Sequence, residues 1–483
     1  MPPPPGWMSW DRLLSPSVQA SPSTLPDIDS LELRSLAFYQ QIVAPSLCGP
    51  LDSSFWTRLV LQMTHSEPAT RHAVLAISSL YENFDDRPMT ISQSIGRIEA
   101  RTGDGDGDGS SAATRNDFAI QHYNAAIQHL ISPQANLNAP ADLNTVLLVC
   151  ILFTCIEFLR GDPESAISHS QHGISLLNSG REDIKLELVR VFRHLSIFPY
   201  FFGGQISTFP VLNDSQLLGG LFGSLEEALE SMDWLLARAV RLVRASDYFR
   251  SGIGVEEQPL QVILLEQSQL EEDLDSWNRA LGDFHSRRKD SRDRTPEARD
   301  AITLLILEMR WLVCKIWTST CHSSEETIYD QYVDKFQRIV ETATQAETLL
   351  EDHDTSIHHK FMFVMGFCPL LYFVVTKCRF LGLRLRALSL LQALSYMRET
   401  LWDASTLYAV GKRIVEIEHG IGPLTKEDVD AGAKTAAAVP DEEARVRDSA
   451  MEAELDVRED VVRRKVCFLM RDQEGIKNLY DWV

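Results

Sequence analysis

Residues 31–84 read LELRSLAFYQQIVAPSLCGPLDSSFWTRLVLQMTHSEPATRHAVLAISSLYENF, and this stretch decides the fold. Its apolar residues recur every three or four positions, the spacing that places side chains on one face of an amphipathic helix. Short polar segments divide the pattern into three parts, so we predict three helices that form one wall of a helical bundle. The residues expected to face the bundle interior are Leu36, Tyr39 and Val43 in the first helix, Phe55, Trp56, Leu59, Val60 and Met63 in the second, and Ala73, Val74, Ile77, Leu80, Tyr81 and Phe84 in the third.

Residues that start or stop helices flank each of the three parts. Ser30 can cap the first helix, and Pro45 should end it because proline disfavours the helical conformation of the residue before it. Asp52 or Ser53 can cap the second helix. Pro68 should begin the third, since proline is favoured in the first turn of a helix. The signals therefore predict three short helices and not one long one.

The helical periodicity continues along most of the chain, so we predict an all-α fold, a multi-helix bundle with helical hairpins. The segment LNTVLLVCILFTCIEFLRGD, which follows Asp142, is apolar almost all round, as is typical of a helix at the centre of a bundle. Two pairs fit the capping-box pattern, Ser224 with Glu227 and Ser323 with Glu326. Both pairs should mark the beginning of a helix.

Composition separates a helical centre from polar flanks. Proline and serine dominate the first residues, and such a segment buries too little apolar surface to fold. Near the carboxyl end, alternating residues around Asp472 to Gly475 predict a short β-hairpin. The predicted organisation is a disordered leader over 1–29, an all-helical domain over 30–420 with a flexible acidic insert at 85–116 and a charged internal linker at 283–299, an acidic disordered or weakly helical segment over 421–465, and a tail over 466–483.

Charge and cysteine content restrict the classes of function. The formal net charge is -22, from 46 basic and 68 acidic residues. A protein that grips DNA through its phosphates needs a basic surface, so this chain is not expected to bind DNA strongly by itself. Eight cysteines without framework spacing indicate reduced thiols inside a cell. The most apolar run, 146–153, is shorter than the roughly 20 residues that span a bilayer, so no membrane association is expected.

Two patterns resemble metal sites, and in both the simpler interpretation is favoured. Asp104, Asp106 and Asp108 match the first half of a calcium-binding loop, but Arg115 stands where the bidentate glutamate should be. A flexible acidic loop is the preferred interpretation. His169 and His172 are three residues apart on a predicted helix, yet no third ligand lies near them in the sequence. We interpret them as surface histidines, so no metal ligand is assigned.

Other candidate sites have equally simple alternatives. Cys150 and Cys155 are interpreted as small buried hydrophobic residues. The aromatic run IFPYFFGG, 197–204, either lines a ligand cavity or belongs to the core. The basic residues 287–289 are either a weak nuclear-import signal or part of a solvated loop. No nucleophile elbow, phosphate loop, dinucleotide fingerprint or His-Glu-x-x-His motif occurs, so no catalytic or cofactor-binding residue is assigned and no enzyme activity is predicted.

Polar residues within the opening stretch carry a family resemblance. Phe-Trp, Leu-Gln, His-x-Glu-Pro-Ala and Arg-His-Ala occur there in fixed order, and a core pattern alone would not specify Gln62, His65 or Arg71. A second block, NAAIQHL followed by VLLVCILFTCIEFLRGDPESAISHSQHGISLL, agrees. Together the blocks resemble the regulatory, or middle homology, domain of fungal binuclear zinc-cluster transcription factors. The resemblance extends from about 31 to 483 and is weaker in 200–300.

The resemblance implies a nuclear transcription regulator with a ligand-sensing domain, which controls a metabolic or secondary-metabolite pathway. The six-cysteine DNA-binding module of that family has no counterpart in this sequence, where the first cysteine is Cys48 and no Cys-x-x-Cys occurs. DNA would therefore be reached indirectly or through a missing amino-terminal module. The expected partners are the transcription machinery or another transcription factor, with a small-molecule inducer and homo- or heterodimer formation compatible with the family. The alternative is a helical scaffold or co-regulator that acts through a protein partner.

Overall fold

The computed structural model describes most of the residues that follow the amino-terminal leader. Of the predicted acidic insert it describes only the last residues, so the calcium-like pattern lies outside the described part. The leader is likewise outside, except for Asp29. The described residues are 29–49, 54–84, 110–131, 142–179, 184–202, 209–212, 221–252, 256, 258–290, 298–352, 360–432, 438–458, 461–472 and 475–483.

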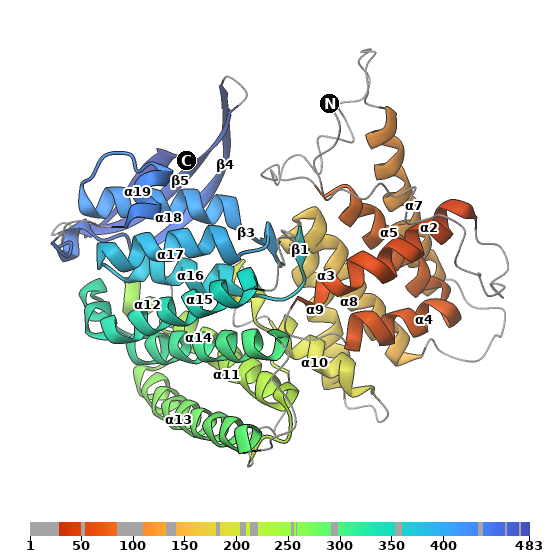
Figure 1. The fold of residues 1–483 in the computed structure, drawn as a ribbon, viewed down its shortest axis with the longest axis horizontal. Helices are drawn as coiled ribbons and strands as arrows, with labels where there is room; N and C mark the ends of the chain where they lie inside the picture. Colours follow the sequence, from red (N-terminus) through yellow and green to blue (C-terminus); the bar gives the residue numbers. More distant parts are fainter. Residues whose placement is uncertain are drawn as a thin grey trace.

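The helices form two halves that lie side by side, and they confirm the predicted all-α bundle (Figure 1). The amino-terminal half contains α2 (Ser30–Phe38), α3 (Ala44–Cys48), α4 (Val60–Ser66), α5 (Pro68–Glu82), α7 (Ser110–Ile131), α8 (Leu143–Arg160), α9 (Pro163–Asn178) and α10 (Leu186–Leu195). The carboxyl-terminal half contains α11 (Leu225–Ala245), α12 (Asp247–Ser251), α13 (Leu260–Asp290), α14 (Ala298–Thr320), the 3-10 helix η4 (Glu326–Tyr332), α15 (Val333–Asp352), α16 (Phe367–Lys377), α17 (Leu381–Leu394), α18 (Ala404–His419) and α19 (Lys426–Ala431).

Helix α8 is the centre of the amino-terminal half, as its apolar sequence predicts. Asp142 caps it through a hydrogen bond to the N–H of Asn144, and Gly161 ends it in the left-handed conformation. Its side chains are buried on every face, and Phe158 packs edge-on against Phe198 at a centroid distance of 4.9 Å. By length and composition α8 would also fit a membrane span, but 72% of it is buried inside the bundle.

The first helical segment differs from the prediction at both ends. Asp29, and not Ser30, is the N-cap, and its carboxylate accepts the N–H of Glu32. Pro45 does not end the helical segment. The helix widens into a π-helical turn over Tyr39–Val43 and continues as α3, with the proline in its first turn. The longer hydrogen-bond spacing of a π-turn tolerates an inserted residue that an α-helix does not.

The two expected capping boxes have different outcomes. Ser224 caps α11, with its hydroxyl accepting the N–H of Glu227 and the Glu227 carboxylate accepting the N–H of Gly223. The prediction at Ser323 is wrong, because the chain there enters a 3-10 helix whose N-cap is Glu325 without a side-chain bond. Instead, Ser323 hydrogen-bonds the backbone of Glu325 in an exposed turn.

Two small sheets complete the fold. One joins β1 (Phe361–Met362), β2 (Arg398–Glu399) and β3 (Trp402–Asp403) in that order, and it lies between the two halves in Figure 1. The other joins β4 (Asp448–Arg458), β5 (Val461–Asp472) and β6 (Gly475–Trp482) as antiparallel neighbours. The predicted hairpin between Asp472 and Gly475 is thus present.

Two predicted flexible segments contain regular structure. The segment 421–465 was expected to be disordered or weakly helical, yet it contains α19, the 3-10 turn Glu442–Ala444, β4 and the first residues of β5. Its polar strand β4 is held by antiparallel pairing with the next strand, β5, which composition alone does not reveal. Likewise, α13 runs through the first half of the predicted linker 283–299 as far as Asp290.

Candidate functional site

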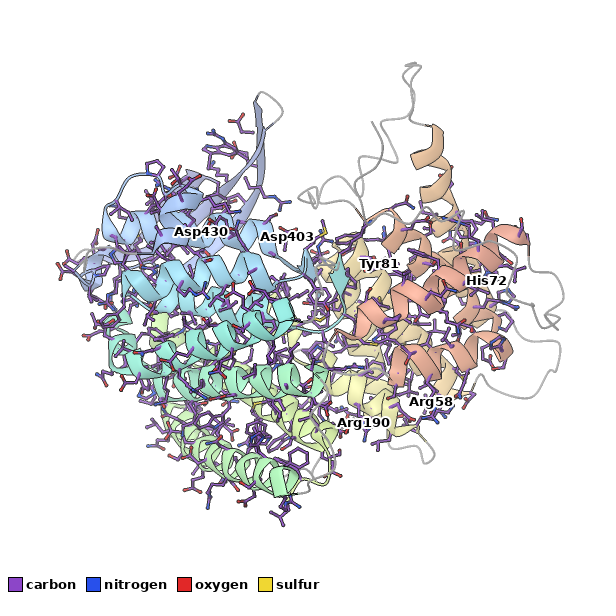
Figure 2. The ribbon with its side chains drawn as sticks, viewed as in Figure 1. Arg58, His72, Tyr81, Arg190, Asp403 and Asp430 are labelled. Carbon is purple, nitrogen blue, oxygen red and sulfur yellow. The ribbon has the colours of Figure 1, made fainter. Side chains whose placement is uncertain are left out.

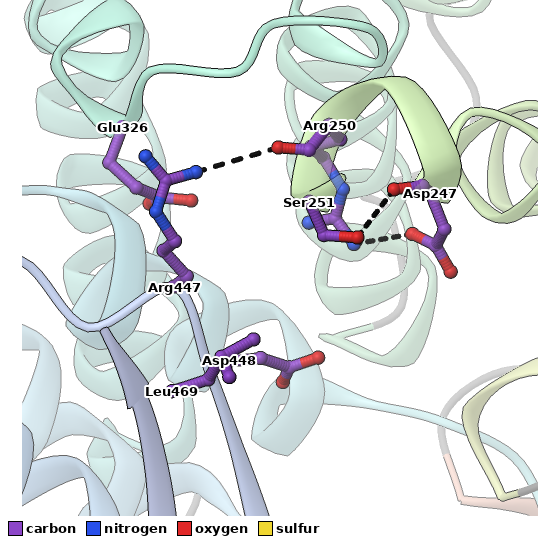
Figure 3. Close-up of a pocket in the computed structure, with 7 residues that line it drawn as sticks. All are labelled: Asp247, Arg250, Ser251, Glu326, Arg447, Asp448 and Leu469. Atoms are coloured by element: carbon purple, nitrogen blue, oxygen red, sulfur yellow. Dashed lines mark hydrogen bonds and ion pairs between the residues drawn. The ribbon is translucent and has the colours of Figure 1, made fainter. Parts of the chain in front are cut away.

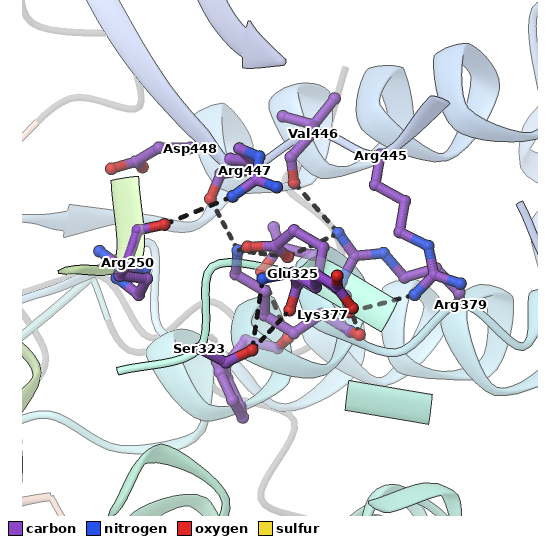
Figure 4. A network of polar contacts seen from close by, with 12 residues as sticks. Arg250, Ser323, Glu325, Lys377, Arg379, Arg445, Val446, Arg447 and Asp448 are labelled. Carbon is purple, nitrogen blue, oxygen red and sulfur yellow. Dashed lines mark hydrogen bonds and ion pairs between the residues drawn. The ribbon is translucent and has the colours of Figure 1, made fainter. Parts of the chain in front are cut away.

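Buried charges gather in the carboxyl-terminal half, where η4, α16, α17 and α18 meet (Figure 4). Glu418 lies between two arginines, 3.1 Å from Nη2 of Arg379 and 2.5 Å from Nη1 of Arg384, and all three side chains are 0% exposed. Glu326 accepts Nζ of Lys377 at 2.9 Å and Nη2 of Arg379 at 3.0 Å. Alternating opposite charges offset the large cost of removing each ion from water.

Residues 440–447, here called the C-terminal clasp, close this network. The carboxylate of Glu442 accepts the first two N–H groups of η4, at 3.0 and 2.8 Å. Arg445 makes a two-pronged pair with Asp330, at 2.9 and 2.7 Å, and it also donates to the carbonyl of Pro440. The clasp therefore satisfies donors and charges that would otherwise be left unpaired at the surface of the helices.

The network keeps its acidic members ionised. Burial alone would raise the pKa of Glu326, but Lys377 and Arg379 outweigh burial and hold it below its ordinary value. Burial would likewise raise the pKa of Glu418, which Arg384 and Arg379 hold below its usual range. Both carboxylates therefore remain charged at neutral pH, and the network is a permanent arrangement of ions.

A cavity of about 220 Å³ adjoins the clasp (Figure 3). Typical pockets for drug-sized ligands are roughly 300–1,000 Å³, so this one fits only a small polar molecule. Helix α12, the beginning of η4 and the paired strands β4 and β5 supply its walls. The lining residues are Asp247, Arg250, Ser251, Glu326, Arg447, Asp448 and Leu469.

Two arginines of the cavity have unused donors. Arg250 pairs with Asp247 at 2.6 Å and Arg447 with Glu442 at 2.6 Å, each through Nη2. Within the described chain, the buried Nε of Arg250 and that of Arg447 have no hydrogen-bond partner. Buried polar groups are normally hydrogen-bonded. The lining also presents the carboxylates of Asp247, Glu326 and Asp448, so the cavity is polar and carries charges of both signs.

A second, smaller pocket lies where the two halves meet. Arg310 donates to Asp233 at 2.8 Å, and His194 lies 3.5 Å from the other carboxylate oxygen. Burial would raise the pKa of Asp233, but His194 and Arg310 hold it below its ordinary value. Phe55, Trp56 and other apolar residues close the pocket to about 60 Å³, so we regard it as a packed junction between the halves.

Residues 34–338 match the family described as the fungal specific transcription factor domain. This segment is well over half of the 483-residue chain. The chain belongs to this family. The resemblance predicted from the sequence is therefore confirmed, and the matched segment runs from within α2 to within α15.

One curated relative is the transcription regulator lscL of Purpureocillium lilacinum. It is 28% identical to this chain over 126 residues, which cover 26% of this chain and 26% of the relative. The match therefore spans about a quarter of the length of that protein. No solved structure matches this chain.

The structure places the sequence-predicted candidates in ordinary roles within the transcription factor domain. His169 lies 3.3 Å from the hydroxyl of Tyr123, which donates to Glu157, and its ring contacts Phe153. The aromatic run is core, since Phe198 packs against α8. Cys155 is fully buried, as expected, and Cys150 is partly buried. His169 is therefore half-buried and not the surface histidine that was predicted, whereas His172 is exposed as expected.

The buried ion network was missed, because its members are spread along the sequence from 326 to 447. Spacing rules detect partners three or four residues apart, whereas this network joins four helices and a strand end. One signal was nevertheless present. Arg379 and Arg384 occur in an otherwise apolar segment, RFLGLRL, and charged residues are almost never fully buried without partners.

Proposed function

We propose that the protein is a nuclear transcription regulator and not an enzyme. The observation that supports this proposal is the match of residues 34–338 to the fungal specific transcription factor domain. The relative from Purpureocillium lilacinum, itself named a transcription regulator, agrees with it. The chain would act in transcription through the transcription machinery or through another transcription factor.

We further propose that the cavity beside the C-terminal clasp receives a small inducer with a carboxylate or a similar acceptor group. The two arginines in the cavity lining, Arg250 and Arg447, support this class of ligand. The cavity walls combine family residues, such as Arg250 and Glu326, with Arg447 from beyond the matched segment. The clasp would then have two positions, and a ligand that binds one of them better would increase the population of that position. A metabolic or secondary-metabolite pathway would be the source of such an inducer.

A reporter assay tests the regulator proposal. The chain is fused to a heterologous DNA-binding domain, and transcription from a promoter that carries the matching site is measured on several carbon and nitrogen sources. Increased or decreased transcription is expected. No change under any condition would contradict the proposal.

Variants at the cavity test the inducer proposal separately. Arg250→Gln removes the charge and the Nε donor, so the response to growth conditions should weaken while basal reporter activity persists. Arg279→Gln is the control, because Arg279 is an exposed arginine on α13 whose side chain donates to the carbonyl of Asp275 and does not line the cavity. Equal responses of the two variants would contradict the inducer site without affecting the regulator proposal.

The net charge of -22 favours a second candidate function, that of a co-regulator without its own DNA contact. Under this alternative the untethered chain would be found at promoters only together with a DNA-binding partner. Chromatin immunoprecipitation of the untethered chain, with and without deletion of candidate zinc-cluster factors, distinguishes the two. Promoter occupancy that survives every such deletion would contradict the co-regulator function.

A further inference from the structure

Three side chains from three helices meet at the outer side of the amino-terminal half. Glu32 comes from α2, His72 from α5 and His122 from α7, and one ligand atom of each lies within 4.8 Å of the others. Nδ1 of His72 is 2.9 Å from Nδ1 of His122, and Glu32 lies 3.8 Å from Nε2 of His122. Figure 2 shows His72 in the amino-terminal half, far from the β4–β6 sheet.

The imidazoles of this cluster are poor bases. Burial, with His122 and His129 nearby, lowers the pKa of His72 to about 4. Burial also lowers the pKa of His122, although Asp29 opposes the effect. Neutral imidazole is the form that binds metal ions.

We propose that Glu32, His72 and His122 bind one divalent transition-metal ion, with Zn²⁺ the best fit. Two imidazoles and one carboxylate form a common zinc ligand set. Nitrogens that share a tetrahedral zinc ion lie roughly 3.3 Å apart, given Zn–N distances of about 2.0–2.1 Å. The two Nδ1 atoms lie 2.9 Å apart and the ring centroids 5.1 Å apart, so the nitrogens face each other and the rings would have to turn before both point at one ion. Glu32, which lies beside Nε2 of His122, would have to rotate to bring its carboxylate to the same ion.

His129 extends the cluster toward solvent. Its ring stacks on that of His72, with a centroid distance of 5.2 Å and an interplanar angle of 15°. It is exposed and lies seven residues, about two helical turns, from His122 on α7. His129 or a water molecule would complete the coordination. A set with three protein ligands from helices distant in sequence would hold α2 against α5 and α7.

The competing interpretation is a simple hydrogen bond between two neutral imidazoles, one ring donating N–H to the other. The contact between the two Nδ1 atoms permits it. That interpretation requires no contribution from Glu32. The two interpretations therefore differ in whether the carboxylate and both histidines act together on one added ion.

Metal binding to the purified full chain, freed of any affinity tag, tests the proposal. Equilibrium dialysis against Zn²⁺ should give one tightly bound ion per chain, and Zn²⁺ should raise the melting temperature. His72→Asn and His122→Asn should each weaken binding by at least about 100-fold, since even outer partners of metal ligands are worth about 10–100-fold. His65→Asn is the matched control, because His65 is exposed on α4 and outside the cluster.

Glu32→Gln provides a second, gentler variant in case a histidine variant fails to fold. Glu32 lies in the first turn of a short helix, so its substitution should leave the circular dichroism spectrum unchanged while weakening Zn²⁺ binding. Co²⁺ should give visible absorption bands in the wild type that decrease in Glu32→Gln. Unchanged zinc affinity in Glu32→Gln and in folded His72→Asn, or no bound zinc in the wild type, would overturn the proposal.

Discussion

The two halves of the molecule are stabilised in different ways. In the amino-terminal half, α8 is surrounded by apolar side chains, and residues such as Phe158 contribute through burial and packing alone. In the carboxyl-terminal half, Arg379, Arg384 and Glu418 occupy equally buried positions with full charges. Apolar packing tolerates changes of pH, whereas a buried ion network depends on every partner being present and ionised. The halves should therefore respond differently to substitution and to pH.

The largest expected effect is that of Glu418→Ala. It leaves the guanidinium groups of Arg379 and Arg384 without their shared carboxylate, and breaking a buried pair in this way typically costs about 3–5 kcal/mol. Urea unfolding at pH 7 measures the loss. Glu427→Ala, at an exposed position on α19, is the control and should change stability by less than about 0.5 kcal/mol.

The pH dependence separates this loss from a packing defect. Because the folded-state pKa of Glu418 lies below its ordinary value, its contribution is complete above the ordinary value and is lost as pH falls through the folded-state pKa. Phe158→Ala, in the other half, should also cost about 3–5 kcal/mol, but equally at pH 4 and pH 7. A Glu418→Ala penalty that did not shrink in acid would contradict the ionic interpretation.

Glu399, at the junction of the halves, should show the opposite pH dependence. Burial raises its pKa to about 7, although the N–H groups of Gly366 and Cys368 oppose the shift. With a folded-state pKa above the ordinary 4.5, the folded protein retains a proton that the unfolded chain loses. Stability is therefore lost as pH rises from about 4.5 to 7, by at most about 1.4 kcal/mol per pH unit.

The matched variant for this effect is Glu399→Gln, which cannot ionise. Unfolding free energies measured at pH 5, 6 and 7.5 should show the wild type losing stability relative to the variant as pH rises. Glu326 and Glu418 do not disturb the comparison, since their pKa values lie below this range and both proteins contain them. Parallel stability curves would show that Glu399 is already ionised throughout the range.

A glycine pair tests how tightly the amino-terminal half is packed. A Cβ at Gly173, on α9, would lie 2.1 Å from Cε1 of Phe192, so Gly173→Ala should destabilise the protein by about 1–3 kcal/mol. Gly282→Ala should act in the opposite direction, because a Cβ there meets nothing within 4 Å and alanine favours the helix by about 0.5–1 kcal/mol. Thermal unfolding of both variants measures the two changes in stability. Changes of the same sign would contradict the predicted difference in packing.

The sequence was informative where structure depends on neighbours along the chain. Apolar periodicity identified α8 and its cap Asp142, and the alternation around Asp472 identified the terminal hairpin. Pro45 was misinterpreted because the helix widens into a π-turn before it and continues as α3 with the proline in its first turn. The clasp and its network could not be predicted, since Glu442 meets η4 more than a hundred residues earlier in the chain.

The smallest expected effect on stability distinguishes Ser224 from Ser323, two serines that both fit the capping-box pattern in the sequence. Ser224→Ala removes a hydroxyl that accepts an N–H at the start of α11, and such a loss typically costs about 1 kcal/mol. Ser323→Ala should cost clearly less, because the hydroxyl of Ser323 bonds the backbone of Glu325 in an exposed turn and does not cap η4. Chemical unfolding of both variants provides the measurement. Equal losses would mean that the turn before η4 stabilises the fold as much as a helix cap does. In that case the capping-box pattern would identify a stabilising serine even where no cap forms.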